Sequence, residues 1–301
     1  MPFVKNKEIM ILSVGEILVD MMGHKNTYTM HVGGAPFNVA VGAKRCGATV
    51  AFVGKVGDDV PGKFIQANLD SFGLDRVDVK VDKVRNTTLA FVAHDESGER
   101  DFAFFRHDTA DYQLTIDDVD FDGYPSLNIL HVGTLMLSEE CGRSFATQLI
   151  DKAESRGVKV SIDANFRDDL YDSKASRNAI FKPYLERADI LKLSADELVE
   201  FTGESDIFDA VKKLGFKDLL FVTDGANGSY VFTKDGSAFV PTEETSVVDT
   251  TGAGDAYYGA ILAGVDHLIL NGECPDTINL IPIAEIANSK GAETASKLGA
   301  I

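Results

Sequence analysis

The chain has 301 residues, of which 45% are apolar, and carries 29 Lys and Arg against 47 Asp and Glu, a formal net charge of −18 at pH 7. This length and composition predict one large domain or two small ones with a packed core. The negative charge argues against nucleic acid or anionic membranes as partners, because it repels their phosphates. Cysteines that form no CxxC pair argue against a disulfide framework or a zinc site and predict a reducing, cytoplasmic location; they are Cys46, Cys141 and Cys274.

The first apolar run, residues 9–15, follows Lys5 and Lys7 and so has the beginning of a signal peptide. Glu16 and Asp20 interrupt it too soon, and no cleavage site of small residues follows. No run in the chain approaches the roughly 18 apolar residues of a membrane span. The sequence therefore predicts a protein without a membrane segment.

Apolar runs alternate with helical patterns along the chain. The runs are nearly continuous, as in strands that are covered on both faces. They lie at residues 9–15, 49–57, 128–133, 158–164, 189–194 and 218–225. Helices are predicted between them, one with Pro36 near its first turn and Gly47 at its end, another from Ser138 to Gly157. This alternation predicts an α/β fold with a mainly parallel sheet and helices on both faces.

Two segments, residues 26–34 and 87–107, instead alternate apolar and polar side chains. The second contains the turn sequence DESGE and predicts a hairpin. Together they predict a small antiparallel lid, with segments at about residues 20–35 and 86–110, inserted into a single domain that spans residues 1–301. A lone hairpin is only marginally stable in water, so we expect the apolar face of the lid to meet substrate, body or a second subunit.

GDDVPGKF, residues 57–64, is close to a phosphate-binding P-loop in its two glycines and its lysine. Phe64 stands where a P-loop needs Ser or Thr for Mg²⁺, and two aspartates would bring negative charge to the phosphate. The segment therefore predicts a turn followed by a helix that starts at a proline. Tyr257 similarly stands where a GxGxxG dinucleotide fingerprint needs glycine.

VVDTTGAGDAYYGA, residues 247–260, places a carboxylate directly after a turn of small residues. The backbone N–H groups of Gly252, Ala253 and Gly254 can approach an anion closely, and the predicted helix that follows adds partial positive charge. Asp255 has two interpretations. It caps that helix, or it takes the proton of an attacking hydroxyl while the amides hold a phosphoryl group. Only the second explains why an anion lies beside an anion-binding turn.

DTTGAGDAYYGA resembles the C-terminal signature of the ribokinase-like sugar kinases, the phosphofructokinase-B family, and residues 32–62 resemble its N-terminal signature. The segments that look most like bacterial fructokinases are GEILVD, FRHDTAD, DANFRDDLY and KLSADEL. The resemblance covers essentially the whole chain. It implies a ribokinase-like three-layer α/β sandwich with a mainly parallel central sheet and a small β-sheet lid.

The resemblance also implies roles for individual residues. Asp255 matches the catalytic base, and the residues that match the anion hole are Gly252, Ala253 and Gly254. Those that match sugar contacts are Asp20, Gly33, Gly34, Asn38, Arg106 and Arg167. An Asp acceptor, an Asn that donates and accepts, and the forked donors of arginine are suited to a polyol and its phosphate.

Sites for ATP and metal ions are implied in the same way. Glu197 matches the acid that organises Mg²⁺ through water, although Ser194 stands where many members have Asn. The positions that match nucleotide contacts are Thr223, Gly225 and Asn288. The positions that match a monovalent cation site, K⁺ in relatives, are Asp249 and Thr251.

Taken as a whole, the resemblance implies an ATP-dependent fructokinase that makes fructose 6-phosphate. Two alternatives stay open at this point. One is a kinase for another acceptor, such as ribose or 2-keto-3-deoxygluconate, and the other is a non-catalytic sensor of sugar or nucleotide on the same fold. The apolar face of the lid further predicts a homodimer formed through the lids.

Overall fold

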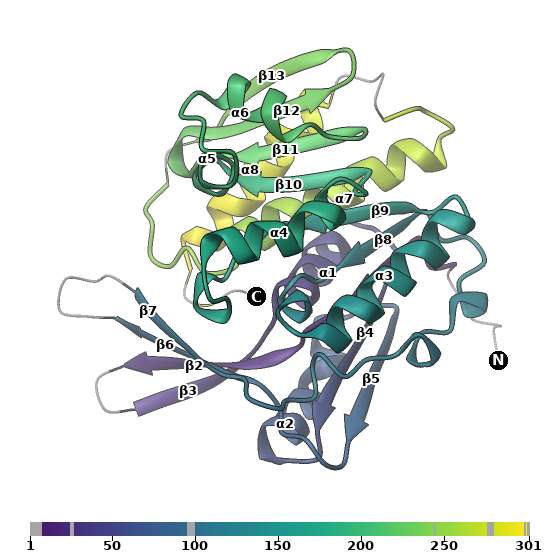
Figure 1. Cartoon of the computed structure of the whole chain (residues 1–301), viewed down its shortest axis with the longest axis vertical. Helices are drawn as coiled ribbons and strands as arrows, with labels where there is room; N and C mark the ends of the chain where they lie inside the picture. Colours follow the sequence, from purple (N-terminus) through teal and green to yellow (C-terminus); the bar gives the residue numbers. More distant parts are fainter. Residues whose placement is uncertain are drawn as a thin grey trace.

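The centre of the protein is a nine-stranded sheet (Figure 1). The structure, a computed structural model, describes residues 8–24, 27–94, 100–243, 245–275, 280–297 and 299. In sheet order the strands are β13 (Gly236–Pro241), β12 (Gly228–Thr233), β11 (Leu219–Thr223), β10 (Ile190–Ser194), β9 (Lys159–Asp163), β8 (Ile129–Val132), β1 (Ile11–Val14), β4 (Val50–Gly57) and β5 (Arg76–Asp82). Neighbours are parallel from β11 to β5 and antiparallel from β11 to β13, so the predicted mainly parallel sheet is confirmed.

Six of these strands coincide with the continuous apolar runs of the sequence. β1 and β8, for example, are buried along their whole length, which is why they lack polar alternation. The sequence analysis misses β5, β12 and β13. β5 is an edge strand that alternates charged residues with valines, and β12 and β13 both begin with Gly-Ser, which shortens their apolar runs.

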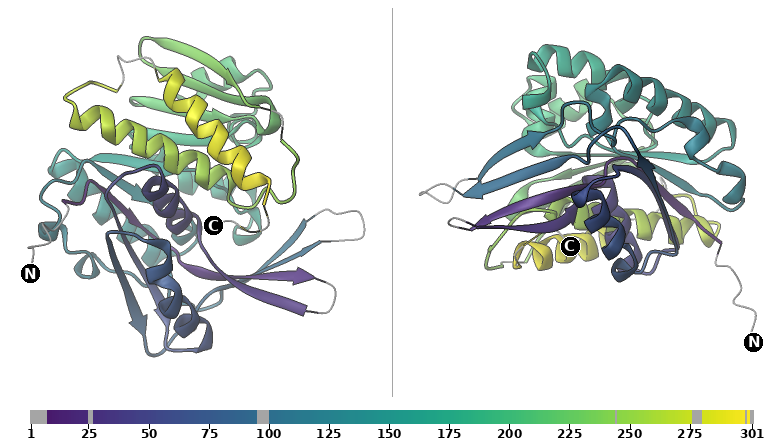
Figure 2. Two further views of the ribbon diagram at one scale, coloured as in Figure 1. Left: turned by 180° about the vertical axis from the view of Figure 1, so that it is seen from behind. Right: turned by 90° about the horizontal axis from the view of Figure 1, so that it is seen from below.

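Helices cover both faces of the sheet, and Figures 1 and 2 show the two layers from opposite sides. One layer consists of α1 (Ala35–Arg45), α2 (Val60–Asn68), α7 (Ala253–Leu270) and α8 (Ile281–Ala295). The other consists of α3 (Glu140–Ser155), α4 (Lys174–Leu185), α5 (Ala195–Thr202) and α6 (Ile207–Leu214). Along β1, Ile11 packs with the first layer, while Leu12 and Val14 pack with the second. The predicted three-layer sandwich is confirmed.

Helix boundaries differ from the expectation at one place. The helix expected to begin at Ser138 begins at Glu140, because residues 135–138 form a short 3₁₀ helix. Ser138 Oγ donates to the carbonyl of Leu135 at 3.1 Å and accepts from Arg106 Nη1 at 2.6 Å. Its hydroxyl is therefore engaged outside α3 and does not cap that helix. None of the helices in the described part of the chain has the length and hydrophobicity that a membrane crossing requires.

A second sheet, the lid, projects from the body (Figure 1). In sheet order its strands are β3 (Thr27–Gly33), β2 (Leu18–His24), β6 (Leu89–His94) and β7 (Arg100–Phe105). The pairs β2–β3 and β6–β7 are antiparallel, but β2 and β6 pair in parallel, so the expectation of an antiparallel lid is wrong at its centre. β2 and β6 both run outward from the body, and for this reason they pair in parallel. The predicted turn at DESGE lies outside the described residues.

The segment at residues 57–64 is a turn followed by a helix, as the sequence predicts. Asp59 is the N-cap of α2, and its Oδ1 accepts from the backbone N–H of Gly62 at 2.8 Å and from Thr87 Oγ1 at 2.6 Å. The carboxylate of Asp59 thus occupies the helix N-terminus where a P-loop would hold phosphate. It also ties α2 to the chain that leads into β6.

Candidate active site

A cavity of about 250 Å³ lies where the carboxyl ends of the parallel strands meet the lid. This is the edge at which open α/β sheets bind ligands. The lid contributes Leu18, Asp20, Ala90 and Phe104 to the cavity wall. The body contributes Glu16, Gly34, Ala35, Asn38, Leu135, Asp163, Asn165, Arg167, Lys192, Thr250, Thr251, Gly252, Gly254 and Asp255. Segments far apart in the sequence, including both of the recognised signatures, therefore meet at one site.

The turn before α7 has the geometry of an anion site. Gly252 is the N-cap and has a left-handed φ of 74°, a conformation that glycine adopts without strain. The amide of Ala253 donates to the carbonyl of Thr250 at 3.2 Å, whereas those of Gly252 and Gly254 have no acceptor among the described residues. The two glycines, rather than all three residues of the turn, thus offer free N–H groups at the positive end of α7.

Asp255 lies in the first turn of α7 but does not cap the helix. Its Oδ2 accepts from Asn38 Nδ2 at 2.8 Å, so the capping interpretation is wrong. Burial raises the pKa of the Asp255 carboxyl, while the hydrogen bond from Asn38 and the charges of Lys192 and Arg167 oppose that rise. A partly buried carboxylate of increased proton affinity that lines a cavity is suited to general-base chemistry.

Polar atoms that could hold a polyol lie on both sides of Asp255. Asn38 is buried, and its Oδ1 has no hydrogen-bond partner among the described residues. Burial raises the pKa of Asp20 on β2 to about 7, and the nearby charge of Asp255 adds to the rise. Gly33 does not line the cavity, but a Cβ atom there would lie 2.0 Å from Asp20 Oδ2, so its missing side chain makes room for that carboxyl. Gly34, with a φ of 111°, does line it.

The two candidate arginines lie in different environments. Arg167 lines the cavity, and its Nη1 donates to the carbonyl of Phe166 at 2.9 Å. Arg106 does not line the cavity, since it is buried and its Nε donates to Asp111 Oδ2 at 2.8 Å. Together with its bond to Ser138, this contact fixes the chain where it leaves β7. Arg106 Nη2 is buried and has no hydrogen-bond partner among the described residues. A direct substrate contact by Arg106 stays a prediction.

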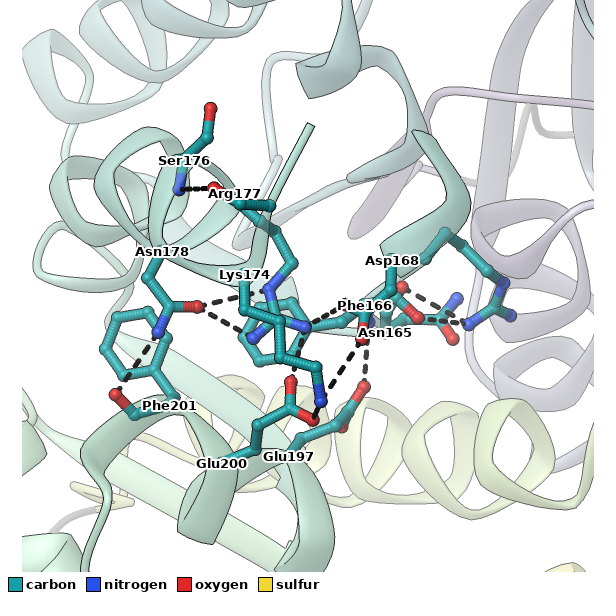
Figure 3. A network of polar contacts seen from close by, with 12 residues as sticks. Asn165, Phe166, Asp168, Lys174, Ser176, Arg177, Asn178, Glu197, Glu200 and Phe201 are labelled. Carbon is teal, nitrogen blue, oxygen red and sulfur yellow. Dashed lines mark hydrogen bonds and ion pairs between the residues drawn. The ribbon is translucent and has the colours of Figure 1, made fainter. Parts of the chain in front are cut away.

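A network of polar contacts holds the loop that carries Arg167 (Figure 3). The guanidinium of Arg177 lies 4.0 Å from the centre of the Phe166 ring, and its Nη1 pairs with Glu200 at 2.6 Å and with Asp168. Arg177 is almost fully buried, so a charge there requires such partners. The residues on both sides of Arg167 are thereby anchored to α4 and α5.

Glu197 belongs to the same network and holds the backbone with both oxygens. Oε1 accepts from the N–H of Phe166 at 2.8 Å, and Oε2 accepts from the N–H of Ser194 at 2.7 Å, which completes a capping box on α5. Glu197 does not line the cavity. No cluster of three or more His, Cys, Asp or Glu that could hold a metal ion occurs among the described residues. Both carboxylate oxygens of Glu197 accept from backbone N–H groups, and its role in organising Mg²⁺ through water stays a prediction.

The expected nucleotide residues lie outside the cavity. Thr223 ends β11, and Gly225 follows in a short 3₁₀ helix, at the same edge of the sheet. Asn288 on α8 is buried, and its Nδ2 donates to the carbonyl of Val240 at 2.9 Å. The amide of Asn288 is therefore engaged in joining α8 to β13. Roles for these residues in nucleotide binding stay predictions.

The expected monovalent-cation residues lie immediately before the anion-binding turn. Asp249 is fully buried; its Oδ1 accepts from the N–H of Thr251 at 2.9 Å and its Oδ2 from the N–H of Gly299 at 3.0 Å. The hydroxyl of Thr251 is buried and has no hydrogen-bond partner in the described part of the chain. An orphaned buried oxygen of this kind fits the ligand set of a hard cation.

The sequence analysis missed an ion pair at the back of the cavity. Lys192 Nζ contacts the two carboxylate oxygens of Asp163 at 2.7 and 2.9 Å, and both side chains are buried. A Cβ atom on Gly254 would lie 3.3 Å from Lys192 Nζ, so the ammonium is next to the anion-binding turn. Burial disfavours the ammonium, but the charges of Asp163, Glu197 and Asp255 outweigh it and raise the pKa of Lys192. One Lys and one Asp inside otherwise apolar strands were the available signal, because buried charges are normally paired.

A carboxylate that lines a cavity beside free amides and an ammonium, at the carboxyl edge of a parallel sheet, has the groups that an enzyme needs to transfer a phosphoryl group to an alcohol. Residues 9–301 match the pfkB family of carbohydrate kinases, and the chain belongs to this family. It is accordingly a phosphotransferase that acts on a sugar hydroxyl.

Fructokinases are among the most similar known proteins. The chain is 34% identical to the probable fructokinase-2 of Arabidopsis thaliana over 97% of this chain and 92% of that protein. The fructokinase of Xylella fastidiosa with bound ATP superimposes with a TM-score of 0.88 at 29% identity, over 97% of this chain and 93% of that one. A double mutant of the fructokinase of Vibrio cholerae O395, with fructose, ADP and potassium ion bound, gives 0.86 at 29% identity, over 97% and 94%.

Proposed function

We propose that this protein is an ATP-dependent fructokinase that phosphorylates D-fructose to fructose 6-phosphate. The observation that carries the proposal is the position of Asp255, which lines the cavity, is hydrogen-bonded to Asn38 and is adjacent to the free amides of Gly252 and Gly254. A sensor would have no use for a base at this point, so the geometry favours catalysis over the non-catalytic alternative. The similarity to fructokinases over the full chain supports fructose as the acceptor.

The polar side chains of the cavity favour a neutral sugar over a sugar acid. Two cations, Lys192 and Arg167, face a larger number of carboxyl groups, and these are Glu16, Asp20, Asp163 and Asp255. Lys192 is already paired with Asp163. A substrate carboxylate would have to enter among these groups with few free cations to meet it. A polyol, whose hydroxyls donate to and accept from carboxyl groups, suits them better.

In the proposed reaction Asp255 accepts the proton of the sugar hydroxyl as that oxygen attacks the γ-phosphorus of ATP, and the bond from this phosphorus to the β–γ bridging oxygen breaks to release ADP. Asn38 holds the Asp255 carboxylate in position through its side-chain amide. The N–H groups of Gly252 and Gly254 and the ammonium of Lys192 stabilise the negative charge on the transferring phosphoryl oxygens. The base and the anion hole thus act on opposite ends of the same transfer, and the lid excludes water from it.

Metal ions complete the proposal. Mg²⁺, when bound, neutralises charge on the phosphates of ATP, and Glu197 would hold it through water. Asp249 and Thr251 would hold K⁺ next to the anion-binding turn. The nucleotide itself would lie along Thr223 and Gly225, with Asn288 beside its adenine.

A coupled assay of ADP release tests the function directly. The acceptors are fructose, ribose, tagatose, 2-keto-3-deoxygluconate and adenosine, each with Mg²⁺ and with or without K⁺. Fructose should give the highest kcat/KM. A higher kcat/KM with 2-keto-3-deoxygluconate or ribose would identify that compound, and not fructose, as the acceptor. If none of the acceptors were phosphorylated, the non-catalytic sensor would be the better account.

Arg167→Ala should raise the KM for fructose by at least ~10-fold and the KM for ATP much less, because a charged donor to a ligand is lost from the sugar side of the cavity. Steady-state kinetics with each substrate varied in turn measure the two effects. Arg187→Ala removes an arginine that pairs with Asp151 and Glu154 away from the cavity and should change neither value. Equal rises for both substrates would contradict the assignment of Arg167 to the sugar.

A homodimer through the lids is also part of the proposal, because one face of the lid is apolar and uncovered. Alternate side chains of the lid strands point away from the cavity, and among them Tyr28 and Phe105 are 48% and 63% exposed. Phe91 lies between them, with ring centres 5.2 and 5.0 Å away. The opposite face, with Asp20, Ala90 and Phe104, lines the cavity.

Light scattering during gel filtration should therefore give twice the chain mass of 32.5 kDa for the wild-type protein. Tyr28→Ser with Phe105→Ser should give a monomer, because the pair removes most of the exposed aromatic surface on this face. Phe208→Ser, at an exposed aromatic on α6, is the matched control and should remain dimeric. A wild-type monomer would rule out the lid interface.

A reducing location fits the cysteines. Cys46 is a partly buried free thiol, Cys141 is an exposed free thiol, and Cys274 is exposed. Exposed free thiols persist where the compartment keeps them reduced. The proposed location is therefore the cytoplasm.

A further inference from the structure

Glu16 is a buried carboxyl group on the cavity wall to which the mechanism above gives no role. It lies between β1 and β2 and is only 2% exposed. From Glu16 onward, every second side chain, first Leu18 and then Asp20, also lines the cavity, as expected where successive residues of an extended chain point to opposite faces. The Glu16 carboxyl therefore lies on the cavity side of the segment that connects the body to the lid.

One oxygen of the Glu16 carboxyl lacks a protein partner. Its Oε2 is buried and makes no hydrogen bond to any described residue. A Cβ atom on Gly133 would lie only 2.5 Å from Oε2, so the backbone of that glycine packs directly against the carboxyl. Buried polar atoms in folded proteins nearly always have a partner. Because Glu16 lines the cavity, a molecule bound there can supply the partner that Oε2 lacks.

Charged groups surround Glu16 without pairing with it. Burial is the main influence and raises the pKa of Glu16 to about 8; a hydrogen bond from the backbone of Glu16 and the charges of Arg106 and Arg167 oppose the rise, and the charge of Asp111 adds to it. Arg106 is committed to Asp111, and neither arginine forms an ion pair with Glu16. The other charged side chains on the same cavity are Asp20, Asp163, Lys192 and Asp255. Near pH 7 the carboxyl is therefore neutral, and it can donate as well as accept a hydrogen bond.

We propose that Glu16 is a specificity-determining residue whose Oε2 forms a hydrogen bond with one hydroxyl group of the acceptor sugar. This inference rests on the proposed kinase function. A hydroxyl both donates and accepts, so it satisfies the carboxyl in either direction. A site built around such a bond rejects analogues that lack the hydroxyl, because the buried group is then left unpaired.

The first test compares fructose with its monodeoxy analogues in the wild-type protein and in Glu16→Ala. In the wild type, the analogue that lacks the contacted hydroxyl should lose at least ~10-fold in kcat/KM. Glu16→Ala should lose a similar factor with fructose but almost nothing further with that analogue, because the contact is already absent. The other analogues should lose the same factor in both proteins.

The second test uses the pH profile of Glu16→Gln, which keeps the size and a donor but cannot ionise. Above about pH 8 the wild-type carboxyl loses its proton and adds negative charge to a cavity that already holds three other carboxyl groups. Wild-type kcat/KM for fructose should therefore fall about tenfold between pH 7 and pH 9. The Gln variant should lack this fall.

Asp266→Asn is the matched control, because Asp266 is a buried carboxyl that accepts from Asn128 at 2.7 Å and does not line the cavity. It should alter neither the analogue pattern nor the pH profile. If the wild type phosphorylated fructose normally but Glu16→Ala showed the same losses with the analogues as the wild type, the role of Glu16 would be overturned. The kinase function would then still stand. If the wild type phosphorylated no sugar, both would fail. Should Glu16→Ala not fold, the profile of Glu16→Gln decides.

Discussion

Asp255→Asn should lower kcat with fructose by at least ~10²-fold, because Asn keeps the size of the side chain but cannot take the proton of the sugar hydroxyl. Asp255 does not cap α7, and its partner Asn38 can donate to an amide oxygen as well as to a carboxylate. The fold and the binding of ATP should therefore be retained. Steady-state kinetics measure the first effect, and calorimetric titration with ATP measures the second.

Asp266→Asn provides a control on the same helix, since it neutralises a buried carboxyl that lies outside the cavity. Its kcat should stay close to that of the wild type. Because burial raises the pKa of Asp255, wild-type kcat/KM should also fall on the acid side at a higher pH than the pKa of a free Asp. Near-normal turnover in Asp255→Asn would remove the base from the mechanism.

Lys192→Met should lower kcat by about 10²-fold, the usual loss when a preorganised donor to a developing anion is removed. Met has a similar length but no charge, so the anion-binding turn would keep its shape and lose the ammonium beside it. The effect on the KM for ATP should be smaller, because the charge on the phosphoryl oxygens is redistributed most in the transition state. Steady-state kinetics with ATP varied separate the two parameters.

Removing Lys192 also leaves Asp163 buried without its cation, which lowers stability. Lys192→Met combined with Asp163→Asn removes that unpaired charge, so its melting temperature should recover while its kcat stays low. Recovery of kcat in the double variant would mean that Lys192 serves only to neutralise Asp163. The comparison thus separates a role in catalysis from a role in folding.

Patterns local in the sequence accounted for the body of the fold. Strands β1 and β8 to β11 are buried on both faces, so each has a continuous apolar run that shows in the sequence without knowledge of its neighbours. The GAGD turn carries its own chemistry in consecutive residues, and Asp255 was therefore recognised from them. Edge strands such as β5 were missed because their pattern depends on what covers each face.

Residues close together in the chain were enough to identify the family, the mainly parallel sheet and the pairing of a carboxylate with an anion-binding turn. Which charged side chains reach the cavity depends instead on tertiary packing and became visible in the structure. It separated Arg167, which lines the cavity, from Arg106, which is bound to Asp111, and it brought Lys192 to Asp163 and to Gly254. The packing of segments that are distant in the sequence decides where a side chain points and how deeply it is buried. The same packing leaves one oxygen of Glu16 without a partner.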